Sequence, residues 1–174
     1  NGGNIRKDIP QGIFTYKDIL EVLPFGHSCA VKELSGKQIL DALEMGARNL
    51  PRETGSFLHV SGLTYEVDAS KPSSVVLNEK GAFVKVGGAY HVHNVRVAGK
   101  PLDLGKIYSV ATITYLLEKN GDGMTMLKNG KVLFIDENMT DAEIVIEYIQ
   151  NHLNARVGEE YANTFGEGRI TIKY

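Results

Sequence analysis

A run of short, β-like segments between residues 57 and 113 limits most strongly what this chain can fold into. The segments are rich in β-branched and aromatic residues, and turn residues separate them at 71–72, 78–81, 87–88 and 98–99. They comprise residues 65–67, 74–77, 82–86, 90–97 and 108–113, and two further strands are expected at 132–135 and 169–174. A chain with so many strands in its middle must build a substantial sheet.

Three other segments carry the start signals of helices. Each begins with a Ser or Thr N-cap followed three residues later by an acid or amide, namely Thr15/Asp18, Ser35/Gln38 and Thr140/Glu143. We expect these helices to run to Leu23, to Leu50 before Pro51, and to about Leu153. Strands outnumber helices, so the sequence predicts an α+β fold with a mixed or antiparallel sheet and packed helices, in a single domain over residues 1–174.

Composition narrows the functional class. The 174 residues include 43% hydrophobic side chains, carry a formal net charge of −2 and contain no Lys/Arg run, so nucleic acid is not an expected partner. No apolar stretch approaches the roughly 20 residues that a membrane span needs. Cys29 is the single cysteine, which leaves no disulfide framework and no Cys-based zinc site within the chain.

Four local patterns then follow one another in a specific order. They are Asn-Gly-Gly-Asn-Ile-Arg at 1–6, Leu-Pro-Phe-Gly at 23–26, Thr-Gly at 54–55 before an apolar strand, and Asn-Gly-Asp-Gly at 120–123. Ser-Gly-Leu at 61–63 and a hairpin-like segment at 97–102 lie between them, and Gly-Arg-Ile at 168–170 comes near the end. This ordered set resembles the C-terminal domain of 5′-nucleotidases, a family that includes UDP-sugar hydrolases and 2′,3′-cyclic phosphodiesterases. The resemblance covers nearly the whole chain.

The resemblance implies a two-domain enzyme. An N-terminal metallophosphatase domain would hold two divalent metals, such as Zn or Mn, and the C-terminal domain would bind the nucleoside and the phosphate of a nucleotide. The metal motifs of that family, and a helix with two further phosphate-binding arginines, do not occur in this chain. We therefore expect the chain alone to be inactive and to hold no catalytic residue and no metal. The resemblance also implies a periplasmic, cell-surface or secreted location.

The first motif is interpreted as the phosphate end of a site. A Gly-rich turn can bring backbone N–H groups close to an anion, and a guanidinium grips phosphate in a bidentate manner. The resemblance makes Arg6 a phosphate ligand and Asn1 a polar contact to the substrate. Asn4 stands where the family often has a third glycine, and Asn tolerates the left-handed backbone geometry that such a turn would need.

Aromatic residues are interpreted as the base end of the site. Phe25 lies in a Pro-Phe-Gly loop, and the resemblance makes it one plate of an aromatic clamp around a nucleobase. Tyr115 is expected to be the second plate, by a one-residue insertion at 117–120, although the family position falls on Leu116. The alternative is that Tyr115 is a core residue at a strand end. His27 stands where some members have an Asn that contacts the base, and it can donate or accept the same bond.

Two further residues complete the expected site. Asp122 lies between two glycines, and the resemblance makes it the residue that binds the ribose; capping of its own loop is the alternative. Gly55 is expected to offer its backbone to the substrate, with simple turn geometry as the alternative.

The sequence leaves three functions open. The chain is the substrate-binding half of a 5′-nucleotidase, a freestanding non-catalytic module that binds a nucleoside or another ligand, or the corresponding domain of a thiosulfohydrolase. The last of these would need no base clamp, so Phe25 and its nearby aromatic residue argue mildly against it. His91 and His93 alternate as metal ligands can, but no third ligand is evident.

Overall fold

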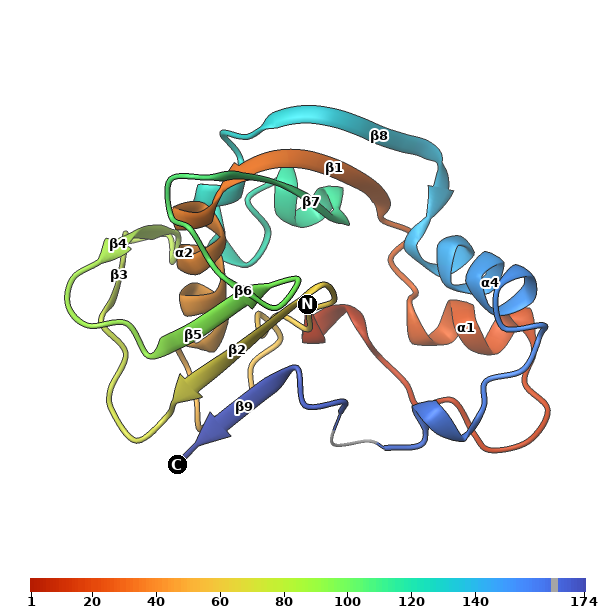
Figure 1. The fold of residues 1–174 in the computed structure, drawn as a ribbon. Helices are drawn as coiled ribbons and strands as arrows, with labels where there is room; N and C mark the ends of the chain where they lie inside the picture. The colour runs from red at the N-terminus through yellow and green to blue at the C-terminus, as the bar shows by residue number, and fades with distance from the viewer. Residues whose placement is uncertain (164–165) are drawn as a thin grey trace.

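The computed structural model describes residues 1–163 and 166–174 (Figure 1). The β-strands within this part of the chain are β1 (Ser28–Ser35), β2 (Leu63–Asp68), β3 (Val75–Leu77), β4 (Phe83–Val86), β5 (Val92–Val97), β6 (Lys100–Pro101), β7 (Ile107–Ile113), β8 (Lys131–Thr140) and β9 (Ile170–Lys173). The α-helices are α1 (Tyr16–Val22), α2 (Gly36–Ala47), α3 (Thr114–Leu117) and α4 (Asp141–Asn151). Short 3-10 turns occur along the same chain as η1 (Gly2–Asn4), η2 (Gly121–Gly123), η3 (Thr125–Leu127) and η4 (Glu159–Tyr161).

The strands form two sheets and a separate hairpin. One sheet is antiparallel, in the order β7-β1-β8, and the other has the order β6-β5-β2-β9. In the second sheet β2 pairs antiparallel with β5 and parallel with β9, so that sheet is mixed. The α+β prediction is confirmed. Figure 1 shows the antiparallel sheet above, the mixed sheet below, and α2 between them.

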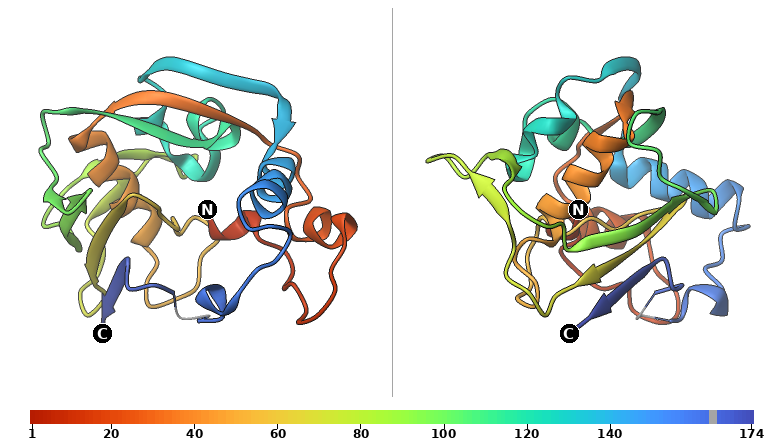
Figure 2. Two further views of the ribbon diagram at one scale, coloured as in Figure 1. Left: turned by 45° about the vertical axis from the view of Figure 1, so that its right-hand side comes forward. Right: turned by 60° about the vertical axis from the view of Figure 1, so that its left-hand side comes forward.

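The main core lies around α2 and the facing sides of both sheets. Its buried members include Leu34 of β1, Leu43 and Met45 of α2, and Val67 of β2, each at most 3% exposed. A second, smaller core joins α1 to α4 through Ile19 and Ile146. Figure 2 shows that this helix pair stands to one side of the two sheets.

Strand β1 and the short helix α3 are elements that the sequence pattern did not reveal. The inward side chains of β1 are Ala30, Lys32 and Leu34, so a lysine occupies a core position and breaks the apolar alternation. Lys32 is 1% exposed, and its Nζ donates to the carbonyls of Leu117 at 3.0 Å and Lys128 at 2.9 Å. The same ammonium is paired with Glu118 at 2.6 Å. Two hydrogen bonds and an ion pair together compensate for the burial of this charge.

The helices and strands that the sequence predicts are present, although their ends differ by a few residues. All three capping boxes form, at Thr15, Ser35 and Thr140. Helix α2 ends at Ala47 rather than Leu50, while β8 is longer than expected and continues to the cap of α4. No helix in the described part of the chain is both long and apolar enough to cross a membrane.

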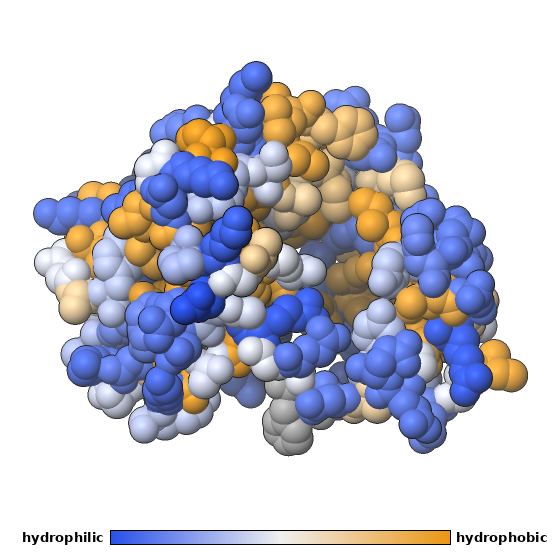
Figure 3. Space-filling model, in the orientation of Figure 1, coloured by the Kyte–Doolittle hydropathy of each residue, from blue (hydrophilic) through white to orange (hydrophobic). Residues whose placement is uncertain are grey.

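A hollow lies on the face drawn in Figure 3, between the N-terminal turn η1 and the α1–α4 pair. The connection from α1 to β1 borders this region, as the same orientation in Figure 1 shows. The sequence motifs at 1–6 and 23–26, which α1 separates along the chain, are therefore brought to one side of the molecule.

Candidate ligand-binding site

Three aromatic rings form a stack beside the N-terminal turn. Phe25 belongs to the connection between α1 and β1, His27 directly precedes β1, and Tyr115 belongs to α3. The ring centroids of Phe25 and His27 are 5.7 Å apart with planes at 19°, and those of His27 and Tyr115 are 5.2 Å apart at 17°. The predicted plates and the predicted base contact are thus brought together, with the imidazole in contact with both plates.

The backbone around His27 fixes where these rings can reach. Gly26 has a φ of +62°, a conformation that L side chains rarely adopt, and it turns the chain out of α1 into β1. The carbonyl of His27 accepts a hydrogen bond of 2.8 Å from the backbone N–H of Asp141, the first residue of α4. The main chain at His27 is therefore anchored, while Phe25, earlier in the same connection, remains 53% exposed.

Helix α3 explains why Tyr115 rather than Leu116 reaches the stack. Leu116 and Leu117 are 1% and 0% exposed and belong to the main core. Tyr115 is half-buried, and its hydroxyl donates to Asp122 Oδ1 and accepts from the backbone N–H of Asp122, both at 3.2 Å. The expected one-residue shift agrees with this geometry; the role of Tyr115 as a plate stays a prediction.

The Gly-Asp-Gly loop is shaped around that ring. Asp122 has a left-handed φ of 54°, and Gly121 lies against Tyr115. A Cβ at Gly121 would fall 2.3 Å from the Tyr115 ring, so no larger residue fits without moving it. The loop therefore presents the Asp122 carboxylate at the edge of the stack.

Asn1 joins the N-terminal turn to this loop. Its side-chain Nδ2 donates to Asp122 Oδ2. Its Oδ1 is buried and has no hydrogen-bond partner among residues 1–163 and 166–174. A buried acceptor without a donor is costly unless something else satisfies it. The Asn1 amide holds the Asp122 carboxylate in place on one side, as the Tyr115 hydroxyl does on the other.

The glycines of the N-terminal turn have a different function from the one expected. Their N–H groups do not point to an anion site, because Gly2 donates to the Phe57 carbonyl at 2.8 Å and Gly3 to the Gly55 carbonyl at 2.7 Å. A Cβ at Gly3 would lie 3.2 Å from the backbone of Gly55, and a Cβ at Gly55 would lie 3.1 Å from Gly3. Both glycines serve close packing of two backbone segments. A substrate contact of Gly55 stays a prediction.

Asn4 also corrects the sequence interpretation. It is not among the residues with positive φ in the described chain, so it does not replace a left-handed glycine. Its side chain is 7% exposed and donates from Nδ2 to Asp141 Oδ2 at 2.6 Å. The amide thereby ties η1 to Asp141 in the first turn of α4, and the backbone of Asp141 also anchors His27.

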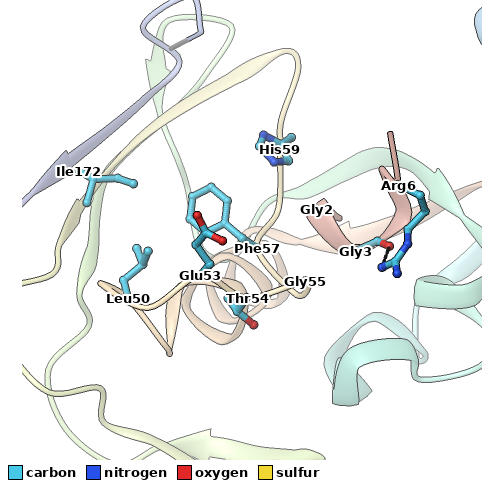
Figure 4. Close-up of a pocket in the computed structure, with 10 residues that line it drawn as sticks. All are labelled: Gly2, Gly3, Arg6, Leu50, Glu53, Thr54, Gly55, Phe57, His59 and Ile172. Carbon is cyan, nitrogen blue, oxygen red and sulfur yellow. Dashed lines mark hydrogen bonds between the residues drawn. The ribbon is translucent and has the colours of Figure 1, made fainter. Parts of the chain in front are cut away.

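Arg6 lies at the border between the stack and a neighbouring cavity. Its guanidinium carbon is 6.0 Å from the centroid of Phe25, and Nη1 donates to the Gly3 carbonyl at 3.4 Å (Figure 4). The cavity has a volume of about 560 Å³, and Gly55, Phe57 and His59 line it together with Arg6. Burial lowers the pKa of His59, which favours its neutral form. Arg6 itself is exposed.

Arg48 is a basic residue near the site that no sequence motif indicated. It follows α2, and its Nη1 donates to the Met45 carbonyl at 2.6 Å and to Ser56 Oγ at 2.8 Å. Burial lowers the pKa of its guanidinium, and the attraction of the Asp122 carboxylate acts in the opposite direction. Arg48 contributes positive charge near Asp122. This role is apparent only when the fold brings the end of α2 close to the loop that holds Asp122.

The two alternating histidines do not converge on a common point. His91 Nε2 lies 2.6 Å from the Pro72 carbonyl, whereas His93 Nε2 is 3.4 Å from Glu66. Within the described ranges, no group of three or more His, Cys, Asp or Glu side chains is arranged to hold a metal ion.

Comparisons with known proteins show which family this chain is similar to. The profile of the family described as "5'-nucleotidase, C-terminal domain" matches residues 1–129. The chain is 32% identical to the 5′-nucleotidase of Rattus norvegicus over 153 residues, which are 86% of this chain and 25% of that protein. It is 27% identical to protein UshA of Escherichia coli (strain K12) over 150 residues, 86% of this chain and 23% of that protein. The chain thus spans about a quarter of the length of these relatives.

A solved structure agrees with the sequence matches. The 5′-nucleotidase precursor from Thermus thermophilus superimposes with a TM-score of 0.77 and 35% identity, over 99% of this chain and 30% of that one. The sulfate thiohydrolase SoxB of Thermus thermophilus has the same fold at a TM-score of 0.58 and 20% identity, over 94% of this chain and 26% of that one. The profile, the relatives and the superposition agree, and the chain belongs to the family of 5′-nucleotidase C-terminal domains.

Proposed function

We propose that this chain binds the nucleoside and phosphate of a nucleotide substrate for hydrolysis by a metal-dependent 5′-nucleotidase. The observation that carries the proposal is the stack of Phe25, His27 and Tyr115 beside the Asp122 carboxylate. A flat aromatic surface complements a nucleobase, and a neighbouring carboxylate that accepts hydrogen bonds complements the hydroxyls of a ribose.

Each part of a nucleotide has a complementary group at this site. A nucleobase stacks on Phe25 and Tyr115, an interaction worth about 1–3 kcal/mol per base whatever its identity. The ribose hydroxyls donate to Asp122, and Asn1 is a polar contact beside that carboxylate. The phosphate pairs with Arg6, which lies against Phe25 and can carry the anion at the rim. Gly55 contributes backbone at the same rim, and His27 lies on the ring faces of Phe25 and Tyr115.

Catalysis is assigned to a second domain. Two metal ions would activate water and neutralise the charge that develops on the phosphoryl group. A metallophosphatase domain, as the resemblance implies, is the proposed partner that holds these metals, and the proposal is that this chain alone turns over no nucleotide. The residues of this chain hold the substrate and orient its phosphate toward that partner.

Isothermal titration calorimetry with adenosine and AMP tests the proposal. Phe25→Ala removes a stacking surface and is expected to weaken both ligands about tenfold or more. Arg6→Ala removes the phosphate partner and keeps the Phe25 ring that the guanidinium lies against, so it should weaken AMP much more than adenosine. Lys7→Ala is a matched control, because Lys7 is the neighbouring exposed cation and pairs with Glu21 instead.

The alternatives give different results in the same titration. A site for a sulfur substrate, as in a thiosulfohydrolase, predicts no binding of adenosine by the wild-type chain, and this result would refute the proposal. A freestanding nucleoside module predicts that adenosine binds and that Arg6→Ala has no effect on AMP. The stack favours a nucleoside ligand over a small inorganic one, because an inorganic anion gains nothing from an aromatic surface.

A further inference from the structure

The surface that a nucleobase would use is occupied by the protein's own His27. The imidazole is nearly parallel to Phe25 and to Tyr115, at angles of 19° and 17°, and it lies within stacking distance of each. An aromatic ligand gains its stacking energy from those same ring faces. The ligand and the imidazole therefore compete for one surface.

The imidazole of His27 is stacked on two rings and has no polar partner among the described residues. No hydrogen bond of either ring nitrogen is present within residues 1–163 and 166–174, and no ion pair of His27 occurs there. In contrast, His91 and His93 each have a ring nitrogen in a hydrogen bond. A stacked ring without polar partners can leave at modest cost.

The main chain at His27 is anchored independently of its imidazole. The His27 carbonyl is anchored by the N–H of Asp141 at 2.8 Å, and Asp141 is itself held by Asn4 at 2.6 Å. The contacts that hold the start of β1 therefore do not depend on the position of the imidazole.

We infer that His27 is an intramolecular competitor of the ligand, which lowers affinity by occupying the aromatic surface until a base displaces it. The inference rests on the proposed nucleoside function. Only the fraction of molecules with the imidazole displaced can bind, and the apparent dissociation constant rises by the inverse of that fraction. This factor belongs to the free protein, so it is the same for every base. His27 therefore sets affinity and not base preference.

The competitor model and a simple base contact predict opposite results for one substitution. His27→Ala removes the competing ring, so adenosine and uridine should both bind more tightly, by the same factor of roughly three to ten. His27→Phe keeps a ring that stacks but cannot hydrogen-bond, and both ligands should bind no more tightly than to wild type. If His27 instead contacts the base through hydrogen bonds, both substitutions weaken binding and do so unequally for the two bases.

Calorimetry of the 174-residue chain with adenosine and uridine makes the comparison. Weaker or unchanged binding to His27→Ala, with clear binding to wild type, overturns the inference and leaves the proposed function standing. Absence of adenosine binding to wild type, His27→Ala and His27→Phe alike refutes the proposed function, and the inference with it.

A measurement on the wild-type chain keeps the inference testable if a variant does not fold. Nuclear Overhauser contacts between the His27 imidazole and the Tyr115 ring are expected in the free protein and should disappear at saturation with adenosine. Their persistence in the bound state would overturn the inference, because the imidazole would then share the stack with the base.

Discussion

The position of the Tyr115 ring depends on one residue that has no side chain. Gly121 lies directly against the ring, and its φ is not among the positive values, so space and not backbone conformation requires glycine there. The Tyr115 hydroxyl in turn exchanges hydrogen bonds with Asp122. One glycine thereby determines both the second stacking surface and the orientation of the carboxylate.

Gly121→Ala is predicted to impair ligand binding more than folding. A Cβ at 2.3 Å from the ring must push Tyr115 out of the stack, which should weaken adenosine about tenfold or more in calorimetry. Gly105→Ala is the control, because a Cβ there meets only the Asp103 carboxylate at 3.7 Å. Equal adenosine affinity in Gly121→Ala and wild type would show that the Tyr115 ring does not stack on the ligand.

At the scale of elements, two charged side chains hold neighbouring segments of the sheets together. Lys32 of β1 joins α3 and the turn after η3 through two carbonyls and Glu118. Glu66 of β2 accepts from Asn94 of β5 at 2.9 Å and is paired with Lys173 of β9. Each residue connects segments that are far apart in the sequence.

Lys32→Met should destabilise the fold by about 2–4 kcal/mol, because two buried carbonyls and the Glu118 carboxylate would lose their partner. Urea unfolding measures the change. Lys131→Met, an exposed lysine of β8, is the control and should stay within about 0.5 kcal/mol of wild type. A loss below about 1 kcal/mol in Lys32→Met would contradict the role given to the buried ammonium.

The lowered pKa of Glu66 predicts that the fold loses stability in acid. Hydrogen bonds from Lys173 and Asn94 lower the pKa of its carboxyl from 4.5 to about 2. The folded pKa is below the unfolded one, so its contribution is fully present above about pH 4.5 and is lost as the pH falls toward about 2. In urea unfolding from about pH 6 to about pH 2.5, the difference between wild type and Glu66→Gln should shrink as the pH falls. Parallel pH profiles would contradict this account.

At the scale of the whole molecule, the sequence predicts the class of fold and the neighbourhood of the site but not its contacts. Turns, capping boxes and most strands follow from local chemistry, and the order of the Gly-containing motifs indicates the family. Strand β1 escapes prediction because Lys32 occupies a core position that only distant carbonyls make favourable. The true function of Gly3, packing against Gly55, is equally invisible before the two segments meet.

For the candidate site too, the sequence predicts the residues, whereas only the structure shows their contacts. Phe25, Tyr115 and Asp122 could be proposed from sequence, and the structure brings them together through Asn1 and His27. The stacking of His27 on both rings, and the charge of a nearby arginine that acts on Asp122, depend on chain crossings that no local pattern encodes. The site is therefore a product of the tertiary fold, with residues from the N-terminal turn, the connection before β1, and the loop after α3.

The central claim, that this aromatic site binds the nucleoside part of a nucleotide, is tested most directly by mapping adenosine binding on ¹⁵N-labelled chain by NMR. Chemical-shift changes are predicted to concentrate at the backbone amides of residues 25–28, 115–116 and 121–123, with a saturable dependence on adenosine concentration. Saturable changes confined to other surfaces, or none at millimolar adenosine, would contradict the account.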